Sequence, residues 1–371
     1  MPLDSEGFVV TFAADEDSAI REFLDVWGFV AVRECLGTAE CEDTLADCFK
    51  YLEDEAWRRG GDTEAAVGGV RRGDSRTWES GCGWPSGMAQ SEGIIGEHIA
   101  WTRRSLVNRM NPALYRVFSA LLGESDLLVS HDRYGFFRPA ATHPERATDR
   151  NLHFDCNPWT KFNVPVDNAK ARTSQQDARP VDAAPYADEG DFIREGNYAE
   201  TAGLQAMINL IDNRSEDGGF HCVPQFHKRV AAWAAQHPEL GGSFASDATF
   251  CPFFWEPSPG SKGEDAIADA SGLSAEAQRV PLRRGVLLVW DQLLPHGSSP
   301  NCSLTPRAVQ LLTLRPAAAI GSPAERIARA EVVLRRVRDV GALEEITGAG
   351  KRVFGFHELE EKSLQASLPR L

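Results

Sequence analysis

The chain has 371 residues, of which 42% are hydrophobic, and its formal net charge is −15 at pH 7. The hydrophobic content supports a sizeable core, and the length fits one large domain with flanking helices or two smaller domains. The acidic balance excludes the broad basic surface that a nucleic acid or an anionic membrane would require. We therefore expect a small-molecule substrate, and neither a nucleic-acid nor a membrane partner.

The eight cysteines are scattered and none forms a C-x-x-C pair, which favours a reduced, cytoplasmic protein. The opening residues MPLDSEGFVV lack a basic region and a long apolar stretch, so no signal peptide is expected. The final residues Pro369, Arg370 and Leu371 are distantly similar to the peroxisomal signal S-K-L. A peroxisomal location is thus a weakly supported alternative.

Residues 1–125 are predicted to form a mainly helical N-terminal part. Apolar spacing near 3.6 predicts a helix over 16–26, which Gly28 ends before a short strand, FVAV. Further helices are expected over 38–57 and over 94–123, the second with a break near Asn111 and Pro112. The Gly-, Arg- and Ser-rich residues 60–93 are predicted to be a loop.

A first barrel strand is expected within residues 127–139, and Arg133 and Tyr134 in it lead towards the next strand, where they could contact substrate. In that next strand, residues 151–155 read Asn-Leu-His-Phe-Asp. Because side chains at i and i+2 share a face, His153 and Asp155 can bind one ion together. Taken alone, the triplet also fits a surface histidine beside a solvated carboxylate.

Asn157 and Trp159 follow directly and either line the substrate side or turn the chain. Residues 163–200 are polar and Pro-interrupted, without a stable period, which is typical of a lid, a binding loop or disorder. A strand is expected over 204–212, where Gln205 shares a face with Asn209 and could reach a co-substrate. A Gly-rich turn then leads into a strand over 220–223.

The last part of the predicted barrel supplies a second histidine and an arginine. An apolar run over 286–290 predicts a buried strand, and His296 follows it closely enough to face a cavity. Arg307 opens another predicted strand, where a buried guanidinium needs an anionic partner. That partner is either a carboxylate of this chain or the far carboxylate of a dicarboxylate co-substrate. A C-terminal helix is predicted over 323–340.

Two histidines and one carboxylate with open positions opposite them are the ligand set of non-heme Fe(II) oxygenases. His153, Asp155 and His296 are therefore the candidate metal ligands, and together with Arg307 they favour an iron site with a dicarboxylate co-substrate. Histidines at other positions lack a carboxylate at ligand spacing on a strand.

At this point the sequence resembles the phytanoyl-CoA dioxygenase family of Fe(II)- and 2-oxoglutarate-dependent oxygenases. The resemblance runs from about residue 16 to residue 316, and its matching stretches are residues 28–32, 153–155, 217–224, 227–228 and 293–307. It implies a mainly β fold with flanking α-helices, a double-stranded β-helix of the jelly-roll or cupin-like kind. It also implies Fe(II), 2-oxoglutarate and O2 as cofactors and co-substrate.

By this resemblance His153, Asp155 and His296 are the iron ligands, Arg307 binds the far carboxylate of 2-oxoglutarate, and Ser298 assists it. Halogenating relatives replace the carboxylate ligand with Gly or Ala, so Asp155 favours hydroxylation. Gln225 and Phe226 stand where the family often has Gly-Ser, which is expected to alter a loop beside the pocket rather than the metal site.

We therefore predict one dioxygenase domain over 1–371, with a helical part (1–125), a barrel core (126–316), a lid-like insertion (163–200) and a C-terminal helical extension (317–371). The expected reaction is hydroxylation of a small molecule with release of succinate and CO2. Desaturation, cyclisation or epoxidation with the same cofactors remains open, since these reactions diverge only after hydrogen abstraction. A hydrolytic zinc site and a catalytically silent binding module are further alternatives.

Overall fold

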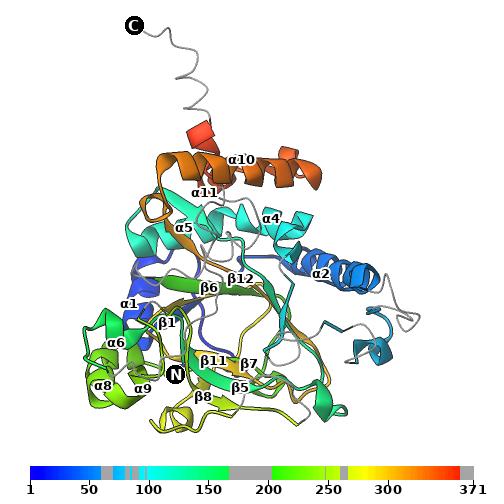
Figure 1. Cartoon of the computed structure of the whole chain (residues 1–371). Helices are drawn as coiled ribbons and strands as arrows, with labels where there is room; N and C mark the ends of the chain where they lie inside the picture. The colour runs from blue at the N-terminus through cyan, green and yellow to red at the C-terminus, as the bar shows by residue number, and fades with distance from the viewer. Residues whose placement is uncertain are drawn as a thin grey trace, which may run out of the picture.

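Two antiparallel sheets face each other in the computed structural model, with helices packed on their outer sides (Figure 1). The structure describes residues 1–59, 70–79, 84–85, 92–96, 98–166, 203–246, 248–259 and 266–359. The expected lid, apart from its first four residues, and the end of the chain lie outside the described residues.

The larger sheet carries the helical layer on its outer face. Within the described chain it has six strands in the order β1-β10-β6-β12-β4-β2. Their bounds are β1 (Phe29–Val32), β10 (Leu287–Asp291), β6 (Leu204–Asn209), β12 (Arg307–Leu312), β4 (Tyr134–Phe137) and β2 (Ile94–Ile95).

The smaller sheet carries the predicted metal ligands. Its order is β8-β5-β11-β7-β9, again counting described residues alone. Its strands are β8 (Cys251–Glu256), β5 (Arg150–Phe154), β11 (His296–Ser299), β7 (Gly219–Cys222) and β9 (Gln278–Arg279), and a separate pair joins β13 (Leu314–Pro316) to β3 (Leu127–Val129). Two facing antiparallel sheets assembled from alternating parts of the chain form a double-stranded β-helix, which confirms the predicted fold class.

The outer face of the larger sheet is covered by α1 (Asp17–Trp27), α2 (Thr38–Arg59), α4 (Arg103–Arg109), α5 (Pro112–Leu122), α10 (Pro323–Asp339) and α11 (Gly348–Val353). Three short helices, α6 (Pro158–Lys161), α8 (Val230–Gln236) and α9 (Pro238–Gly241), gather at one side of the smaller sheet (Figure 1). Single 3-10 turns are η1 (Ser75–Trp78), η2 (His98–Trp101), η3 (Pro144–Arg146), η5 (Ser215–Asp217), η6 (Phe226–Lys228), η7 (Leu273–Ala275), η8 (Ala317–Ala319) and η9 (Leu343–Glu345).

Strand β12 shows how alternation separates two environments. Ala308 and Leu312 belong to the hydrophobic cluster shared with the helices, whereas Val309 belongs to the second cluster, together with Met207 and Trp290. Because successive side chains point to opposite faces, Arg307 lies on the side of Val309 and faces the space between the sheets.

Helix ends follow local sequence signals. α1 ends at Gly28, whose left-handed φ of 78° closes the helix and whose N–H bonds the Leu24 carbonyl. α10 begins at Ser322 with a reciprocal capping box to Glu325 and with Pro323 in its first turn. The predicted N- and C-terminal helices at these positions are confirmed.

The helix predicted from residue 94 onwards was wrong in its first part. Ile94 and Ile95 form a short edge strand against β4, and a 3-10 turn over His98–Trp101 precedes α4. The β-branched pair stands between Gly93 and Gly96, both with positive φ, and these residues block a continuous helix. None of the helices described in the structure combines the length and apolar character of a membrane crossing.

Candidate metal centre

His153, Asp155 and His296 converge between the sheets. His153 lies on β5, Asp155 follows directly after that strand, and His296 opens β11 opposite His153 in the strand register. The Asp155 carboxylate lies between the two imidazoles, with Oδ1 3.5 Å from His153 Nε2 and Oδ2 3.3 Å from His296 Nε2. One potential ligand atom from each residue lies within 4.8 Å of the others, which is close enough for one ion to bridge them.

Both imidazoles present the same nitrogen to the centre. His153 Nδ1 lies 2.9 Å from the Asn151 side-chain oxygen, and His296 Nδ1 lies 2.9 Å from the Leu294 carbonyl oxygen. Since both partners only accept, each Nδ1 carries the proton and each Nε2 keeps its lone pair for a metal.

The protonation states suit a cation. Burial lowers the pKa of His153 to about 3, so this imidazole is neutral at physiological pH. Burial alone would raise the pKa of the Asp155 carboxyl, but His153, His296 and the Gln205 hydrogen bond together hold it below its usual value. The centre therefore offers a neutral imidazole from His153 and an ionised carboxylate from Asp155.

Gln205 lies at this centre on β6. Its Nε2 donates to Asp155 Oδ2 over 2.7 Å, and its Oε1 accepts from Trp290 Nε1 over 3.0 Å. Gln292 donates to the Asp155 backbone carbonyl over 2.8 Å. The glutamine that was expected to reach a co-substrate is thus bonded to a candidate metal ligand.

Arg307 is buried, with 2% of its surface exposed. Its guanidinium carbon lies 4.4 Å from the centre of the Phe137 ring, and Nη2 lies 3.5 Å from the Met207 sulfur. Among the described residues, none gives Nε or Nη1 a hydrogen-bond partner. Burial, and to a smaller extent the charge of Arg279, lowers the pKa of Arg307 well below its usual value. A buried cation in this state is costly, and an anionic ligand would relieve it.

Gly219 lies against Arg307, and Ser298 shares a face of β11 with the candidate ligand His296. Ser298 lies two residues after His296 on β11 and so on the same face, opposite Phe220. Gly219, opposite Ser299, has φ +101°, and a Cβ there would stand 2.2 Å from Arg307 Nε. Strand β11 therefore leads from the candidate ligands towards the Arg307 guanidinium.

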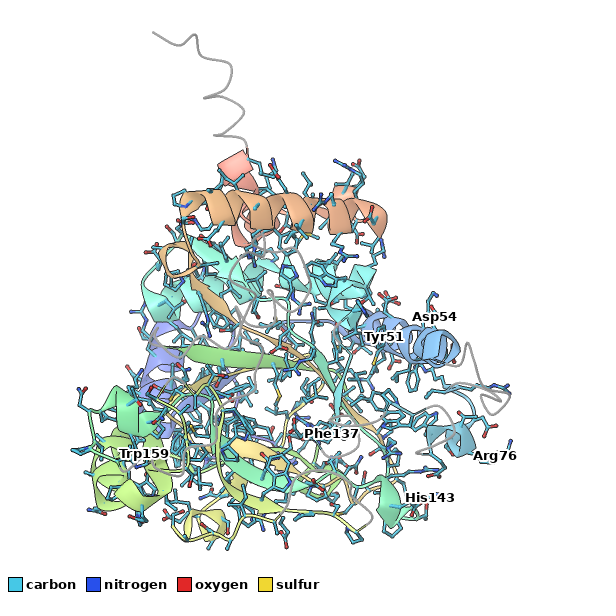
Figure 2. The ribbon with its side chains drawn as sticks, viewed as in Figure 1. Tyr51, Asp54, Arg76, Phe137, His143 and Trp159 are labelled. Atoms are coloured by element: carbon cyan, nitrogen blue, oxygen red, sulfur yellow. The ribbon has the colours of Figure 1, made fainter. Side chains whose placement is uncertain are left out.

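Asn157 and Trp159 have partners in the small helices beside β5. Asn157 caps α6 by accepting from the Thr160 backbone N–H and donates to the Ala245 carbonyl. Trp159 is fully buried, donates to the His237 carbonyl and packs 5.5 Å from the Trp233 ring. Figure 2 places Trp159 within this helical corner. Both side chains are thus engaged in capping and packing, at a position for which the sequence had left open whether they line the substrate side or turn the chain.

Arg133 and Tyr134 also lie outside the group formed by the three candidate ligands. Arg133 pairs with the neighbouring Asp132 carboxylate at 3.1 Å. Tyr134 is 1% exposed and belongs to the cluster under the helices, so its ring lies on the outer face of β4. The inner face of that strand presents Phe137, which Figure 2 labels and which contacts Arg307.

Several site residues were not anticipated from the sequence. Asn151 orients His153 from two positions earlier on the same strand, a spacing that alternation could have revealed. Trp290 stands at the end of the predicted buried strand. Phe250 lies 4.6 Å from the His153 ring, half-buried, and nothing in its loop sequence marks it.

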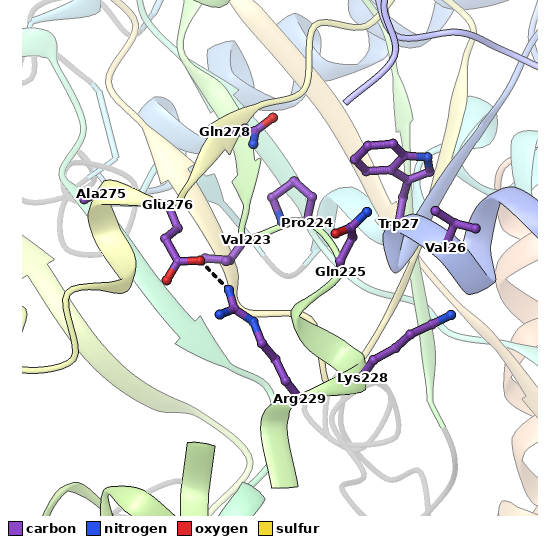
Figure 3. Close-up of a pocket in the computed structure, with 10 residues that line it drawn as sticks. All are labelled: Val26, Trp27, Val223, Pro224, Gln225, Lys228, Arg229, Ala275, Glu276 and Gln278. Atoms are coloured by element: carbon purple, nitrogen blue, oxygen red, sulfur yellow. Dashed lines mark hydrogen bonds and ion pairs between the residues drawn. The ribbon is translucent and has the colours of Figure 1, made fainter. Parts of the chain in front are cut away.

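A second acidic cluster and a surface cavity are less suited to the chemistry. Glu79, His143 and Glu145 also lie within reach of one ion, but Arg146 already pairs with Glu79. A cavity of about 710 Å³ opens between the end of α1 and residues 223–229 and 275–278 (Figure 3). The residues that line it do not include the three candidate ligands.

The residues present fit an iron centre with an anionic co-substrate. The donor set is two imidazoles and one carboxylate, and Arg307 keeps two buried N–H groups without partners in the described part of the chain. The hydrogen bonds at each Nδ1 leave both Nε2 atoms free to bind a metal.

Comparison with known proteins agrees with this arrangement. The family model described as Phytanoyl-CoA dioxygenase (PhyH) matches residues 131–309. A protein of Dictyostelium discoideum called "Putative phytanoyl-CoA dioxygenase" is 28% identical over 305 residues, covering 81% of this chain and 76% of the relative.

Among solved structures, GlcNAc Inducible Gene 2 (GIG2) from Candida albicans has a TM-score of 0.54 at 11% identity, covering 96% of this chain and 84% of that chain. EvdO2 from Micromonospora carbonacea var. aurantiaca complexed with 2-oxoglutarate has a TM-score of 0.41 at 15% identity, covering 82% and 92%. The first likeness supports the fold. The matched segment 131–309 contains all three candidate ligands and Arg307, and over this segment and against the Dictyostelium protein the chain is similar to the phytanoyl-CoA dioxygenase family.

Proposed function

We propose that the protein is an Fe(II)- and 2-oxoglutarate-dependent oxygenase that hydroxylates a small molecule. The observation that carries the proposal is the combination of three converging ligands with a buried arginine that has two unpartnered N–H groups. A zinc hydrolase would need the ligands but would leave the arginine without a role.

In this proposal His153, Asp155 and His296 hold the metal through two imidazole Nε2 atoms and a carboxylate oxygen. Arg307, assisted by Ser298, binds the far carboxylate of 2-oxoglutarate, because a fixed and always-charged guanidinium matches a carboxylate in two parallel hydrogen bonds. When bound, iron, 2-oxoglutarate and O2 supply the oxidant that removes hydrogen from a substrate C–H bond.

The surroundings of the centre support redox chemistry shielded from water. Trp290 and Phe220 pack against the His296 ring at 5.2 and 5.7 Å, and Phe137 and Met207 enclose the guanidinium. Apolar walls exclude competing water and strengthen the electrostatic attraction of the buried cation for an anion. Because Asp155 is present, a metal-binding carboxylate occupies the position that halogenating enzymes leave open.

The first test is an anaerobic titration with Fe(II) and 2-oxoglutarate, in which a chelated keto acid gives a weak visible charge-transfer band. We expect the band in the wild type, its loss in His296→Ala and a large weakening in Arg307→Ala. Folded, metal-loaded wild-type protein without the band would contradict the proposal and favour the zinc or silent-module alternatives.

The reaction outcome needs a separate measurement. A substrate screen by succinate release, followed by mass spectrometry of the product, distinguishes hydroxylation from the alternative reactions. A gain of one oxygen atom supports hydroxylation, although epoxidation gives the same mass gain and is distinguished by the product's C–O connectivity. A loss of two hydrogens indicates desaturation or ring closure.

A further inference from the structure

We propose that Gln205 and Trp290 act as a positioning pair that orients the Asp155 carboxylate for metal binding. This inference rests on the proposed iron site and gives Gln205 a different role from the co-substrate contact expected from sequence. It also assigns a role to Trp290, which was not anticipated.

The pair is built into the strand register. Trp290 on β10 and Gln205 on β6 are direct partners in the antiparallel pairing of the two strands. Directly opposite residues bring their side chains together on one face of a sheet. Here the indole N–H donates to Gln205 Oε1 over 3.0 Å, and Gln205 Nε2 donates to Asp155 Oδ2 over 2.7 Å.

The chemistry of the tryptophan fixes which way the glutamine amide points. An indole nitrogen only donates, so it must face the amide oxygen, and the NH2 group must then face the carboxylate. The Gln205 amide nitrogen in turn stabilises the ionised form of Asp155. If the amide were reversed, two oxygens would face each other across 2.7 Å.

The indole itself is held firmly. Trp290 is 5% exposed, and its ring packs 4.8 Å from Phe220 and 5.2 Å from His296. A side chain fixed on this many sides transmits its orientation to Gln205. Gln292 secures the Asp155 backbone independently through its bond to the carbonyl.

This hydrogen bond determines which oxygen of the Asp155 carboxylate is available to the metal. Gln205 binds Oδ2, while Oδ1 accepts no hydrogen bond from the residues that the structure describes. The carboxylate thus presents Oδ1 on the side of His153 Nε2, 3.5 Å away. Asp155 would bind through one oxygen and leave the other metal positions for co-substrate and O2.

The test measures Co(II) binding and the visible Co(II) spectrum in Gln205→Met, Trp290→Phe and the double variant. Co(II) binding can be measured without anaerobic handling and without turnover, and the shape of the visible Co(II) band reports the coordination number. We expect Gln205→Met to weaken Co(II) affinity about 10- to 100-fold, as loss of such supporting hydrogen bonds does elsewhere. Trp290→Phe keeps the ring packing and should weaken affinity less, with an altered spectrum in both variants.

The double variant distinguishes a relay from two separate effects. If Trp290 acts through Gln205, the double variant should bind Co(II) no more weakly than Gln205→Met alone. Gln310→Met is the control, because Gln310 is a fully buried glutamine whose amide bonds Asn108 and Ser105 on the outer face of β12, away from the candidate ligands. It should lose stability while keeping wild-type Co(II) affinity.

Two results would overturn the inference. One is unchanged Co(II) affinity in Gln205→Met with a raised KM for 2-oxoglutarate, which would make Gln205 a co-substrate ligand. The other is full additivity of the two substitutions. If Gln205→Met does not fold, Trp290→Phe alone decides, since unchanged affinity and spectrum there exclude the relay. Failure of the wild type to bind Co(II) would instead count against the proposed function.

Discussion

Arg109 and Arg307 are both buried, but their surroundings are opposite. In the helical layer, Arg109 donates to the carbonyls of Ser130, Ser105 and Asp132 at 2.8 to 2.9 Å, with a longer bond to Leu311. Between the sheets, Arg307 meets a thioether and an aromatic ring, and two of its N–H groups lack partners among described residues.

The histidines repeat this contrast. On the outer side of the smaller sheet, His221 bonds the Asn151 carbonyl through Nε2 and the Ser299 hydroxyl through Nδ1, so both ring nitrogens are used. Inside, His153 and His296 use one nitrogen each and keep the other directed at Asp155. Fully bonded buried polar groups hold a fold together, whereas partly bonded ones that converge mark a ligand site.

The largest effect is expected when the fully bonded arginine is removed. Arg109→Met would leave several backbone carbonyls buried without a donor, and we expect the free energy of unfolding to fall by about 3–5 kcal/mol. Urea denaturation measures this, with the exposed Arg116→Met as control, expected to lose less than about 1 kcal/mol. A loss of unfolding free energy in Arg109→Met as small as that in Arg116→Met would contradict the contrast drawn between Arg109 and Arg307.

The second effect should appear in binding rather than in stability. Arg307→Met removes a buried cation that the protein itself does not satisfy, so the free energy of unfolding should stay unchanged or rise. Affinity for 2-oxoglutarate should fall about 100-fold, roughly 2.7 kcal/mol, because the far carboxylate loses its partner. Titration of the charge-transfer band and urea denaturation give the two numbers. A stability loss like that of Arg109→Met, with affinity intact, would make Arg307 structural.

A smaller effect is expected from the glycine beside Arg307. In Gly219→Ala the new methyl group would stand 2.2 Å from Nε and must displace the guanidinium. We expect 2-oxoglutarate affinity to fall about 10-fold, in addition to backbone strain of roughly 1–3 kcal/mol. Gly272→Ala is the control for strain alone, since Gly272 also has positive φ but has open space around it. Equal affinity for 2-oxoglutarate in Gly219→Ala and Gly272→Ala would show that Gly219 does not affect the position of Arg307.

The smallest effect concerns pH. Burial lowers the pKa of His221 to about 3 from an ordinary value near 6.5, so below pH 6.5 the unfolded state binds a proton that the folded state does not. The free energy of unfolding should therefore fall as pH drops from about 6.5 towards 3, with His221 contributing up to about 1.4 kcal/mol per pH unit. Urea denaturation at pH 7 and pH 5 should show a shallower loss in His221→Gln. If the free energy of unfolding depended on pH equally steeply in His221→Gln and in the wild type, His221 would not have a lowered pKa in the folded protein.

The positions of the candidate ligands were predictable because their signals are local. His153 and Asp155 share a face through strand alternation, His296 follows the apolar run over 286–290, and Arg307 opens a predicted strand. The role of Gln205 could not be predicted, since it depends on the register between β6 and β10, which places Trp290 opposite it. Cross-strand register between distant segments leaves no mark in either segment alone.

The same reason applies to the substrate candidates. Tyr134 and Trp159 stand near the ligands in sequence, but alternation sends Tyr134 to the helical side, and α6 carries Trp159 into a separate corner. The Ile94–Ile95 strand was missed because its pairing partner, β4, follows some forty residues later. Proximity along the chain indicates a site only where the strand direction is also known.

The pairing of His153 with His296 also constrains the order in which the protein can mature. These candidate ligands lie on adjacent strands but are far apart in the chain, so a growing polypeptide offers only His153 and Asp155 until synthesis passes β11. Long-range strand pairing is slow compared with local structure. Metal acquisition is thus expected to follow closure of the smaller sheet, and metal supplied during refolding should stabilise the product without accelerating the early steps.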